Sequence, residues 1–287
     1  MSFILFFLLI SSILLETARN VFSNNFSKNV LVNKTDIYKF NTFMYIGSFA
    51  IQLFFNYEKA SLFTIITAFV FALAIWLNQF FLLEALKCGP MSFTNFIISI
   101  SLIIPIIYGA IVWNEKIRIH QIILLGLLVI AMALALDLKK EKFNRKWLIS
   151  SILSMLFLGI IGILQTTHQT SKYSSEIFSF LRIAFAFTII INLLGWQISE
   201  KKEVSTYKIK SNALVMAAVS GIAMGLVHII SLYLSGVMKK VIFFPLSTGG
   251  LLFITVLSAV IFFKEKLNLK QTIGIIIGTI ALSLIGI

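Results

Sequence analysis

Short charged turns divide this chain into ten apolar runs, and the length of those runs limits what it can fold into. About 20 consecutive apolar residues let an α-helix cross the hydrocarbon core of a bilayer. Backbone groups inside lipid must be paired internally, and the runs are about twice as long as a barrel strand, so they are expected to be helices. The predicted fold is an all-α membrane protein with ten transmembrane helices. They cover approximately Ser2–Asn24, Ile37–Phe55, Leu62–Leu86, Ser92–Trp113, Ile119–Leu136, Trp147–His168, Ile177–Ile198, Asn212–Leu234, Ile242–Phe263 and Thr272–Ile287.

The composition favours a membrane protein over a soluble one. Of the 287 residues, 59% are hydrophobic and 12% are charged, whereas soluble domains carry about 25% charged residues. The net charge of +13 comes from Lys and Arg that lie mostly in the short turns, so the expected partners are membrane lipids and not nucleic acid. The first residues, MSFILFFLLI, predict a first spanning helix and not a removable signal peptide. Cys88 is the only cysteine, and no spacing indicates a metal or another cofactor.

The end of the chain repeats its middle at an offset of 150 residues. WNEKIRIHQ (113–121) aligns with FKEKLNLKQ (263–271), and the same offset places Asn78 opposite His228. We therefore divide the chain into a first five-helix repeat (1–136), a charged linker loop (137–146) and a second five-helix repeat (147–287). Because five is odd, the second repeat should enter the membrane inverted relative to the first. Inverted repeats are typical of secondary transporters.

The orientation of the chain is less well determined. An even number of helices places both termini on the same side of the membrane, which we expect to be the plasma membrane. Counted from the N-terminus, the odd loops hold 16 Lys and Arg residues and the even loops hold 6. By the positive-inside rule this distribution places both termini outside the cell.

Two segments of similar pattern connect these observations to a known family. GPMSFTNFIISISLIIPIIYGAIVWNEKI (89–117) and FFPLSTGGLLFITVLSAVIFFKEKLNLKQTIGIIIGTIALSLI (243–285) each open a helix with small or polar residues and continue to a Glu-Lys turn. The chain resembles the drug/metabolite transporter (DMT) superfamily, in its branch with two EamA-type repeats. SFLRIAFAF (179–187) also resembles the Arg-bearing start of the second helix in such a repeat.

The resemblance implies a ten-helix bundle that moves small organic solutes, commonly by proton-coupled efflux, exchange or uptake. It also implies cytoplasmic termini, which is opposite to the result of the charge count. The chain departs from the family pattern in two places. LLETARNVF (14–22) replaces the Trp-Gly pattern of many members, and Thr42 stands where the second repeat has Arg182.

Charged side chains within an apolar run are costly and need a physical reason. Glu16 and Arg19 are three residues apart, on one face of the first predicted helix, and Asn20 lies one turn from Glu16. One interpretation is a self-neutralising pair near a helix end. The other makes Glu16 a proton-carrying or cation-binding carboxylate, with Arg19 holding an anionic group.

Further candidates are polar residues in the other runs. Arg182 could hold a carboxylate or phosphate, or could be an interfacial anchor. Asn78, Gln79 and Gln165 could bind solute or only bond neighbouring helices, and His228 could also change protonation. The candidate substrate-binding or coupling residues are Glu16, Arg19, Asn20, Asn78, Gln79, Gln165, Arg182 and His228.

Segment order sorts the polar residues into two groups on opposite sides of the membrane. Glu16, Arg19, Asn20, Asn78, Gln79 and Asn95 form one group; Gln165, His168, Arg182 and His228 form the other. His168 should be interfacial and His120 exposed. Glu115 and Glu265 are expected to cap or shape turns. Pro105 and Pro245 should interrupt their helices, and Trp76, Phe80, Phe81 and Tyr233 are possible pocket residues.

The favoured hypothesis is a secondary active transporter that moves a small organic metabolite or drug-like solute by alternating access, with the proton as candidate coupling ion. Glu16 and His228 are the candidates for coupling. An integral membrane enzyme acting on a lipid-linked substrate is the main alternative, although the chain lacks the paired carboxylates or metal-ligand clusters that would indicate catalysis, so we expect no enzyme activity. A channel or a membrane scaffold is a weaker alternative.

Overall fold

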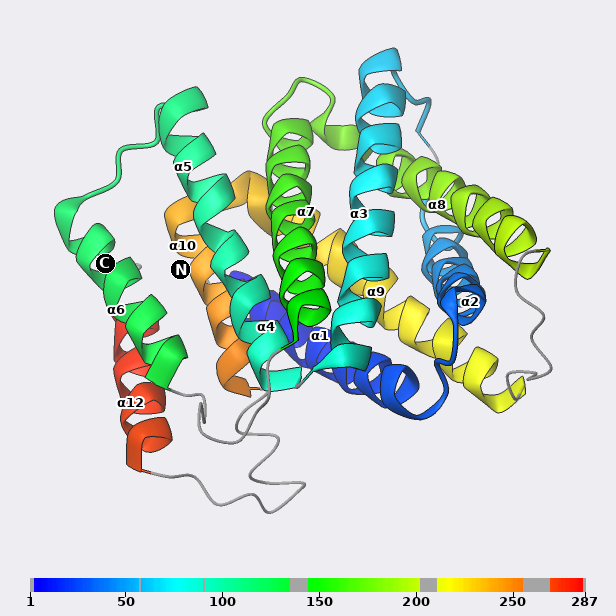
Figure 1. The fold of residues 1–287 in the computed structure, drawn as a ribbon. Helices are drawn as coiled ribbons and strands as arrows, with labels where there is room; N and C mark the ends of the chain where they lie inside the picture. Colours follow the sequence, from blue (N-terminus) through cyan, green and yellow to red (C-terminus); the bar gives the residue numbers. More distant parts are fainter. Residues whose placement is uncertain are drawn as a thin grey trace.

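The computed structural model is a bundle of helices without strands in the part of the chain that it describes, residues 3–56, 58–89, 91–134, 144–201, 211–254 and 269–285 (Figure 1). In chain order the described α-helices are α1 (Phe3–Asn29), α2 (Lys34–Gln52), α3 (Leu62–Cys88), α4 (Met91–Ser99), α5 (Ile103–Val112), α6 (Ile119–Leu134), α7 (Arg145–Gln169), α8 (Ile177–Glu200), α9 (Ser211–Val237), α10 (Lys240–Phe244) and α12 (Leu269–Leu284).

Six of these helical runs are long and apolar enough to cross a membrane: α1, α3, Thr94–Val112, α7, Ser174–Glu200 and α9. Shorter apolar helices cover Ile119–Leu134, Lys240–Ile254 and Thr272–Leu284. Many large apolar side chains point outward, among them Phe7, Ile66, Ile111, Leu194 and Val215. This is the all-helical construction of a multi-pass membrane protein, in which lipid contacts the outer apolar surface.

Polar side chains in the turns fix where several helices begin. Asn33 and Asp36 form a capping box at the start of α2. The side chains of Ser61 and Asn144 accept hydrogen bonds from backbone N–H groups in the first turns of α3 and α7. Each cap satisfies donors that no residue inside the helix can reach.

The predicted end of the first helix near Asn24 is wrong, because α1 continues to Asn29. The sequence NNFSKN has low helix propensity, but Phe26 is buried and stacks on Phe40 of α2 with ring centroids 4.1 Å apart. Ser23 and Ser27 are also buried on this face. Tertiary packing of this kind overrides the weak local preference for a turn.

Two helices are interrupted at the predicted prolines. A 3₁₀ turn (Ile100–Leu102) separates α4 from α5 just before Pro105, and a π-helical stretch begins at Pro245 and ends at Gly249. A proline removes one backbone donor and crowds the preceding turn, so such local changes of helix type are its expected consequence.

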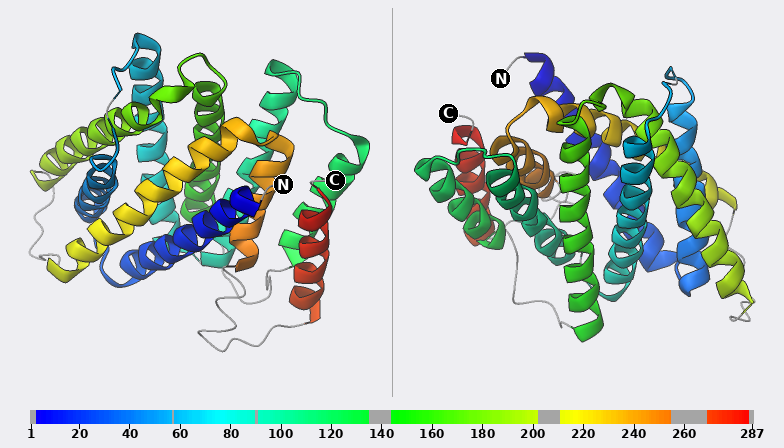
Figure 2. Two further views of the ribbon diagram at one scale, coloured as in Figure 1. Left: turned by 180° about the vertical axis from the view of Figure 1, so that it is seen from behind. Right: turned by 90° about the horizontal axis from the view of Figure 1, so that it is seen from above.

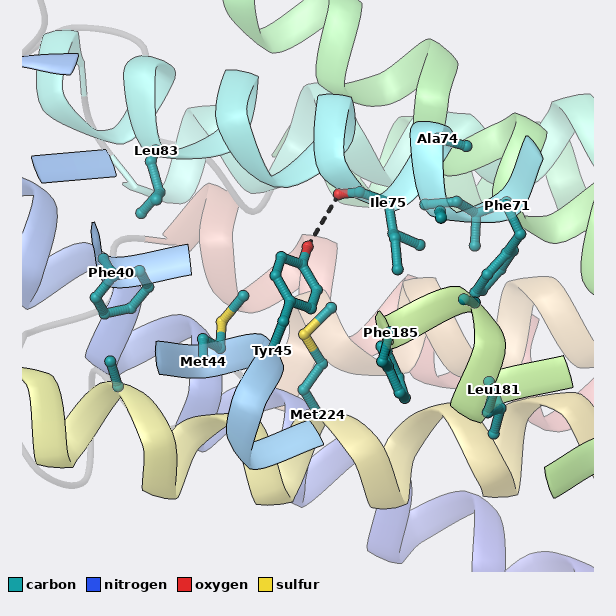
Figure 3. Packing of buried hydrophobic residues seen from close by; sticks show 14 of the residues in the cluster. Phe40, Met44, Tyr45, Phe71, Ala74, Ile75, Leu83, Leu181, Phe185 and Met224 are labelled. Atoms are coloured by element: carbon teal, nitrogen blue, oxygen red, sulfur yellow. Dashed lines mark hydrogen bonds between the residues drawn. The ribbon is translucent and has the colours of Figure 1, made fainter. Parts of the chain in front are cut away.

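The buried apolar residues form two main clusters, one at each end of the bundle. The larger lies among α2, α3, α8 and α9 and includes Tyr45, Phe71 and Phe185 (Figure 3). The other joins the first half of α1 to α5, α6, α10 and α12 (Figure 2). Helices from the first predicted repeat pack on helices from the second: α2 on α8 and α9, α3 on α7 and α8, and α6 on α12. The halves are therefore interlocked.

The crossing of α2 and α9 is unusually close. A Cβ atom on Gly221 would lie 1.8 Å from the carbonyl oxygen of Met44, and one on Gly47 would lie 2.0 Å from that of Ala218. Ser48 Oγ donates a hydrogen bond of 2.8 Å to the Gly221 carbonyl oxygen across the same contact. Small residues that allow backbones to touch are a main source of helix association in lipid.

Replacement of Gly221 by Ala should separate α2 from α9 and destabilise the protein by about 3 kcal/mol, because no flexible side chain can move out of the way. Gly126 in α6 provides the matched control, since an added Cβ there meets no atom within 4 Å. Thermal unfolding of both purified variants in one detergent measures the difference. Equal unfolding temperatures for Gly221→Ala and Gly126→Ala would contradict the close crossing.

Candidate functional site

A cavity opens in the middle of the bundle, between the two apolar clusters. It holds about 940 Å³ of empty space, including the part open to the surroundings. Helices from both predicted repeats line it. Its polar lining consists of Ser12, Glu16, Arg19, Asn78, Gln79, Ser101, Gln165, His228, Ser231, Ser247 and Thr248.

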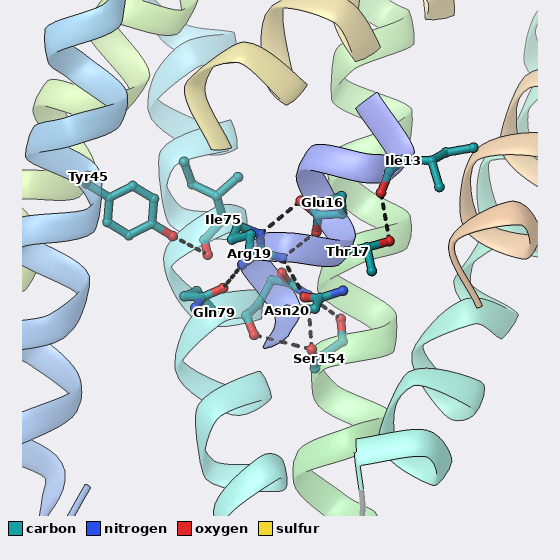
Figure 4. A network of polar contacts seen from close by, with 10 residues as sticks. Ile13, Glu16, Thr17, Arg19, Asn20, Tyr45, Ile75, Gln79 and Ser154 are labelled. Carbon is teal, nitrogen blue, oxygen red and sulfur yellow. Dashed lines mark hydrogen bonds and ion pairs between the residues drawn. The ribbon is translucent and has the colours of Figure 1, made fainter. Parts of the chain in front are cut away.

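The Glu16–Arg19 pair is the centre of the polar network (Figure 4). Arg19 Nε donates to Glu16 Oε2 at 2.9 Å, and Arg19 Nη2 donates to Glu16 Oε1, so the pair is bidentate. Arg19 Nη1 also donates to Gln79 Oε1 of α3 at 2.9 Å, and Nη2 to Asn20 Oδ1 at 3.2 Å. The Arg19 side chain is 7% exposed and that of Glu16 is 22% exposed. A pair this well bonded can exist away from water, where either charge alone would be costly.

A second, smaller cavity of about 460 Å³ shares this pair. Glu16, Arg19 and Asn78 line both cavities, whereas Asn20 and Asn95 line only the smaller one. The Nδ2 atom of Asn95 is buried and has no hydrogen-bond partner among the described residues. The ion pair therefore lies in the wall between two hollows.

Asn78 joins α3 to α7. Its Nδ2 donates to the carbonyl oxygen of Ser154 at 2.9 Å and to Ser154 Oγ at 3.0 Å, and Ser154 Oγ donates to the Asn78 carbonyl oxygen. Asn78 thus bonds a neighbouring helix and also lines the cavity.

Gln165 and His228 meet in the wall of the larger cavity, where Gln165 Nε2 lies 3.2 Å from His228 Nδ1. Phe71 and Phe185 hold the imidazole ring edge-on, with centroids 5.6 and 5.7 Å away. The ring of His228 is therefore fixed beside Gln165 at the edge of the cavity.

The structure brings together residues that the sequence assigned to opposite groups. Glu16, Arg19, Asn78 and Gln79 line the same cavity as Gln165 and His228. Asn20 lies beside it in the smaller cavity. Seven of the eight candidate residues are thus in or next to one hollow, and Arg182 is the exception.

Arg182 lies outside both cavities. Its Nη2 donates to the backbone carbonyl oxygens of Gln52 at 2.8 Å and Phe55 at 3.0 Å. The Gln52 carbonyl belongs to the last residue of α2, and Phe55 lies three residues beyond it. The last turn of a helix leaves acceptors unsatisfied, and a cation is favoured there. This arrangement assigns Arg182 to holding the end of α2.

The remaining residues of interest also take structural positions. His168 is fully buried in the last turn of α7, within 3.1 Å of Thr64 Oγ1, and His120 is exposed as predicted. Glu115 accepts from the backbone N–H of Lys240 at 3.1 Å and pairs with its Nζ at 2.8 Å, so it caps the start of α10. Glu265 lies outside the described residues. Trp76, Phe80, Phe81 and Tyr233 do not line either cavity.

Sequence reasoning missed the hydroxyl lining of the cavity. Ser12, Ser231, Ser247 and Thr248 all face it, and Ser247 and Thr248 belong to the π-helical stretch. Ser and Thr are common in membrane helices, where they bond their own backbone, as Ser12 Oγ does to the Leu9 carbonyl oxygen at 2.8 Å. Pro245, which interrupts the helix just before Ser247 and Thr248, was the sequence feature that could have indicated them.

Comparison with known proteins supports the fold alone. No family model matches the chain, and no curated protein matches it. Among solved structures, 28 chains are similar to it. One of them, described as a crystal structure of a protein, superposes with a TM-score of 0.69 over 96% of this chain and 98% of its own length, at 9% sequence identity. The chain therefore shares a whole-length helical fold with a solved protein.

Replacement of Arg182 by Met should destabilise the protein by about 2 kcal/mol, because two backbone carbonyls lose a charged donor. The same change should leave the affinity for any solute of the central cavity unchanged. Thermal unfolding and equilibrium solute binding, measured on the same purified variant, separate the two effects. A large loss of affinity without loss of stability would indicate that Arg182 contacts the solute.

Proposed function

We propose that this protein is a secondary active transporter, which moves a small organic metabolite or drug-like solute across the plasma membrane by alternating access. The observation that carries the proposal is the central cavity, which residues from both halves of the chain line and which contains a bonded ion pair between a larger and a smaller hollow. In alternating access, a central site between the two halves opens first to one side of the membrane and then to the other.

The proposed architecture is two inverted five-helix repeats that form a ten-helix transporter of the DMT type. The packing between helices supports this architecture. A twofold axis that exchanges the repeats would exchange α1 with α7, α2 with α8 and α3 with α9. It would then convert the α2–α9 contact into the α8–α3 contact, and the α1–α9 contact into the α7–α3 contact. Both members of each pair are present. The α2–α8 and α6–α12 contacts would map onto themselves.

The two interrupted helices supply a way for the cavity walls to move. Ser101 and Leu102 line the cavity at the 3₁₀ turn, and Pro105 lines it in the first turn of α5. Ser247 and Thr248 line it at the π-helical stretch. Interrupted helices at membrane depth are tolerated where they border a cavity, and they are common where transporters bind their solutes.

Reconstitution into vesicles tests this function. A carrier should take up labelled solute with saturation kinetics, and uptake should accelerate when the vesicles are preloaded with the same unlabelled solute. The solute recovered from the vesicles should be chemically unchanged. Flux that rises linearly with concentration would indicate a channel, and a modified solute would indicate the alternative of an integral membrane enzyme.

Glu16 is the proposed site of proton coupling, together with His228. Replacement of Glu16 by Gln keeps the shape of the side chain but removes the group that binds a proton, so accumulation driven by a pH gradient should be abolished. Glu84→Gln is the matched control, since Glu84 is a buried carboxylate paired with Lys146 at 2.7 Å outside both cavities. Vesicles with equal amounts of each variant give the comparison. Unchanged gradient-driven accumulation in Glu16→Gln would remove Glu16 from this role.

A further inference from the structure

An ion pair ties the two interrupted helices together at one end of the bundle. α5 ends at Val112, and the start of α10 packs against α5. Glu115, three residues beyond α5, accepts a hydrogen bond of 3.1 Å from the Lys240 backbone N–H, and its other carboxylate oxygen lies 2.8 Å from Lys240 Nζ. One carboxylate therefore binds both the backbone and the side chain of the first residue of α10.

This ion pair is buried between the helices. The side chain of Lys240 is 8% exposed and that of Glu115 is 20% exposed. Lys240 Nζ also lies 5.3 Å from the centroid of the Trp113 ring, and Tyr108 meets that ring edge-on at 5.0 Å. Removal of either partner leaves the other as an uncompensated charge inside the protein, which is strongly unfavourable. The position of α10 relative to α5 therefore depends on the pair.

The turn after α5 fixes the Glu115 carboxylate in this place. The backbone N–H groups of Trp113 and Glu115 both donate to the Gly109 carbonyl oxygen, at 3.1 and 3.2 Å. Asn114 between them has a φ of 51°, in the left-handed region that asparagine adopts more readily than most residues. The compact turn thus directs Glu115 toward the start of α10.

The same first turn of α10 forms part of the wall of the larger cavity. Phe243 and Phe244, one turn after Lys240, both line that cavity. A Cβ atom on Gly162 of α7 would lie 2.8 Å from Phe244 Cε1 and 3.2 Å from Pro105 Cγ of α5. The Phe244 ring therefore occupies the space that a side chain on α7 would fill, and α5, α7 and α10 meet there.

Access to the larger cavity depends on how its wall can move. Every described residue that lines it is buried or half-buried. α10 leads directly into the π-helical stretch from Pro245 to Gly249, and prolines and π-helical segments are where helices bend. The first turn of α10 can therefore swing about this stretch once its contact with the end of α5 is lost.

We propose that the Glu115–Lys240 pair is a latch. While the pair is formed, it keeps Phe244 packed over Gly162 and the larger cavity closed at this end; when the two side chains separate, the cavity opens there. This inference rests on the proposed transport function, to which it adds a contact that controls access to the site.

The accessibility of a cysteine in the cavity wall tests the latch. Cys88→Ser removes the only cysteine of the chain, and Ser231→Cys then places a reporter in the wall of the larger cavity. The measured quantity is the rate at which a trimethylammonium methanethiosulfonate modifies this reporter in the purified, detergent-solubilised protein. Glu115→Gln and Lys240→Met, added separately, should each raise the rate at least about fivefold, because α10 is no longer held.

A second ion pair between helices provides the matched control. Lys39 Nζ lies 3.0 Å from Glu200 Oε1 and joins α2 to α8, and neither residue lines a cavity. Glu200→Gln in the reporter protein should leave the labelling rate unchanged. Equal rates with and without the Glu115–Lys240 pair would overturn the proposal, and so would an equally large increase in Glu200→Gln.

A further variant opens the same contact without touching the ion pair. In Gly162→Ala the added Cβ must displace Phe244, so the reporter should again be labelled faster, whereas Gly126→Ala, whose Cβ meets no atom within 4 Å, should have no effect. Combined with Glu115→Gln, Gly162→Ala should give no more than the faster single rate, because both changes move the same ring. If Gly162→Ala is labelled no faster than Gly126→Ala, or if the two increases multiply, the latch does not act through Phe244 and the proposal is wrong.

Labelling and flux separate the latch from the transport function. Labelling in detergent reports access to the cavity and needs no gradient, no solute and no closed vesicle. Faster labelling of the latch variants, in a protein that shows no flux in vesicles, would contradict the transport function and support the latch. Saturable flux together with unchanged labelling would contradict the latch alone.

Discussion

Lipid provides no hydrophobic force between helices, because acyl chains are as apolar as leucine side chains. The contacts that hold this bundle together must therefore be close packing and hydrogen bonds between helices. The α2–α9 crossing uses both, with Gly221 against the Met44 carbonyl and Ser48 Oγ bonded to the Gly221 carbonyl. The same kind of bond recurs where the Tyr45 hydroxyl donates to the Ile75 carbonyl of α3. These contacts fix the helices around the cavity, so the cavity depends on them.

The interior polar residues then have two distinct roles. Arg182 satisfies carbonyls at the end of α2, and Asn78 joins two helices through Ser154. Both bind groups of the protein itself. Gln79 binds Arg19 with one end of its amide, and the other end is buried without a partner in the described structure. A buried donor without a partner costs about 1–3 kcal/mol, and such a cost is expected where a ligand supplies the missing acceptor.

The helical fold was predictable from sequence because lipid allows few alternatives to the helix, and apolar length alone identifies a helix that can span. The residues at which helices end were less predictable. α1 continues through Asn29 because Phe26 stacks on Phe40, a contact between residues 14 positions apart in the chain. Glu16 and Arg19 were detectable because charge within an apolar run is rare. The positions of Arg182 and of the hydroxyl groups that line the cavity could not be predicted from the sequence. Only the three-dimensional packing decides whether a polar side chain faces a cavity or a neighbouring backbone.

The placement of the ion pair connects the fold to the proposed transport. The wall between the two cavities consists of residues that line both: Glu16, Arg19, Asn78, Leu158, Thr248 and Leu251. A solute that passes from one hollow to the other must displace some of these side chains. Asn78 is bonded to α7, whereas Thr248 belongs to a π-helical stretch whose backbone pairing differs from that of the adjoining helix. The wall is therefore bonded to a neighbouring helix at Asn78 and formed by an interrupted helix at Thr248, and the Glu16–Arg19 pair borders both cavities between these two sides.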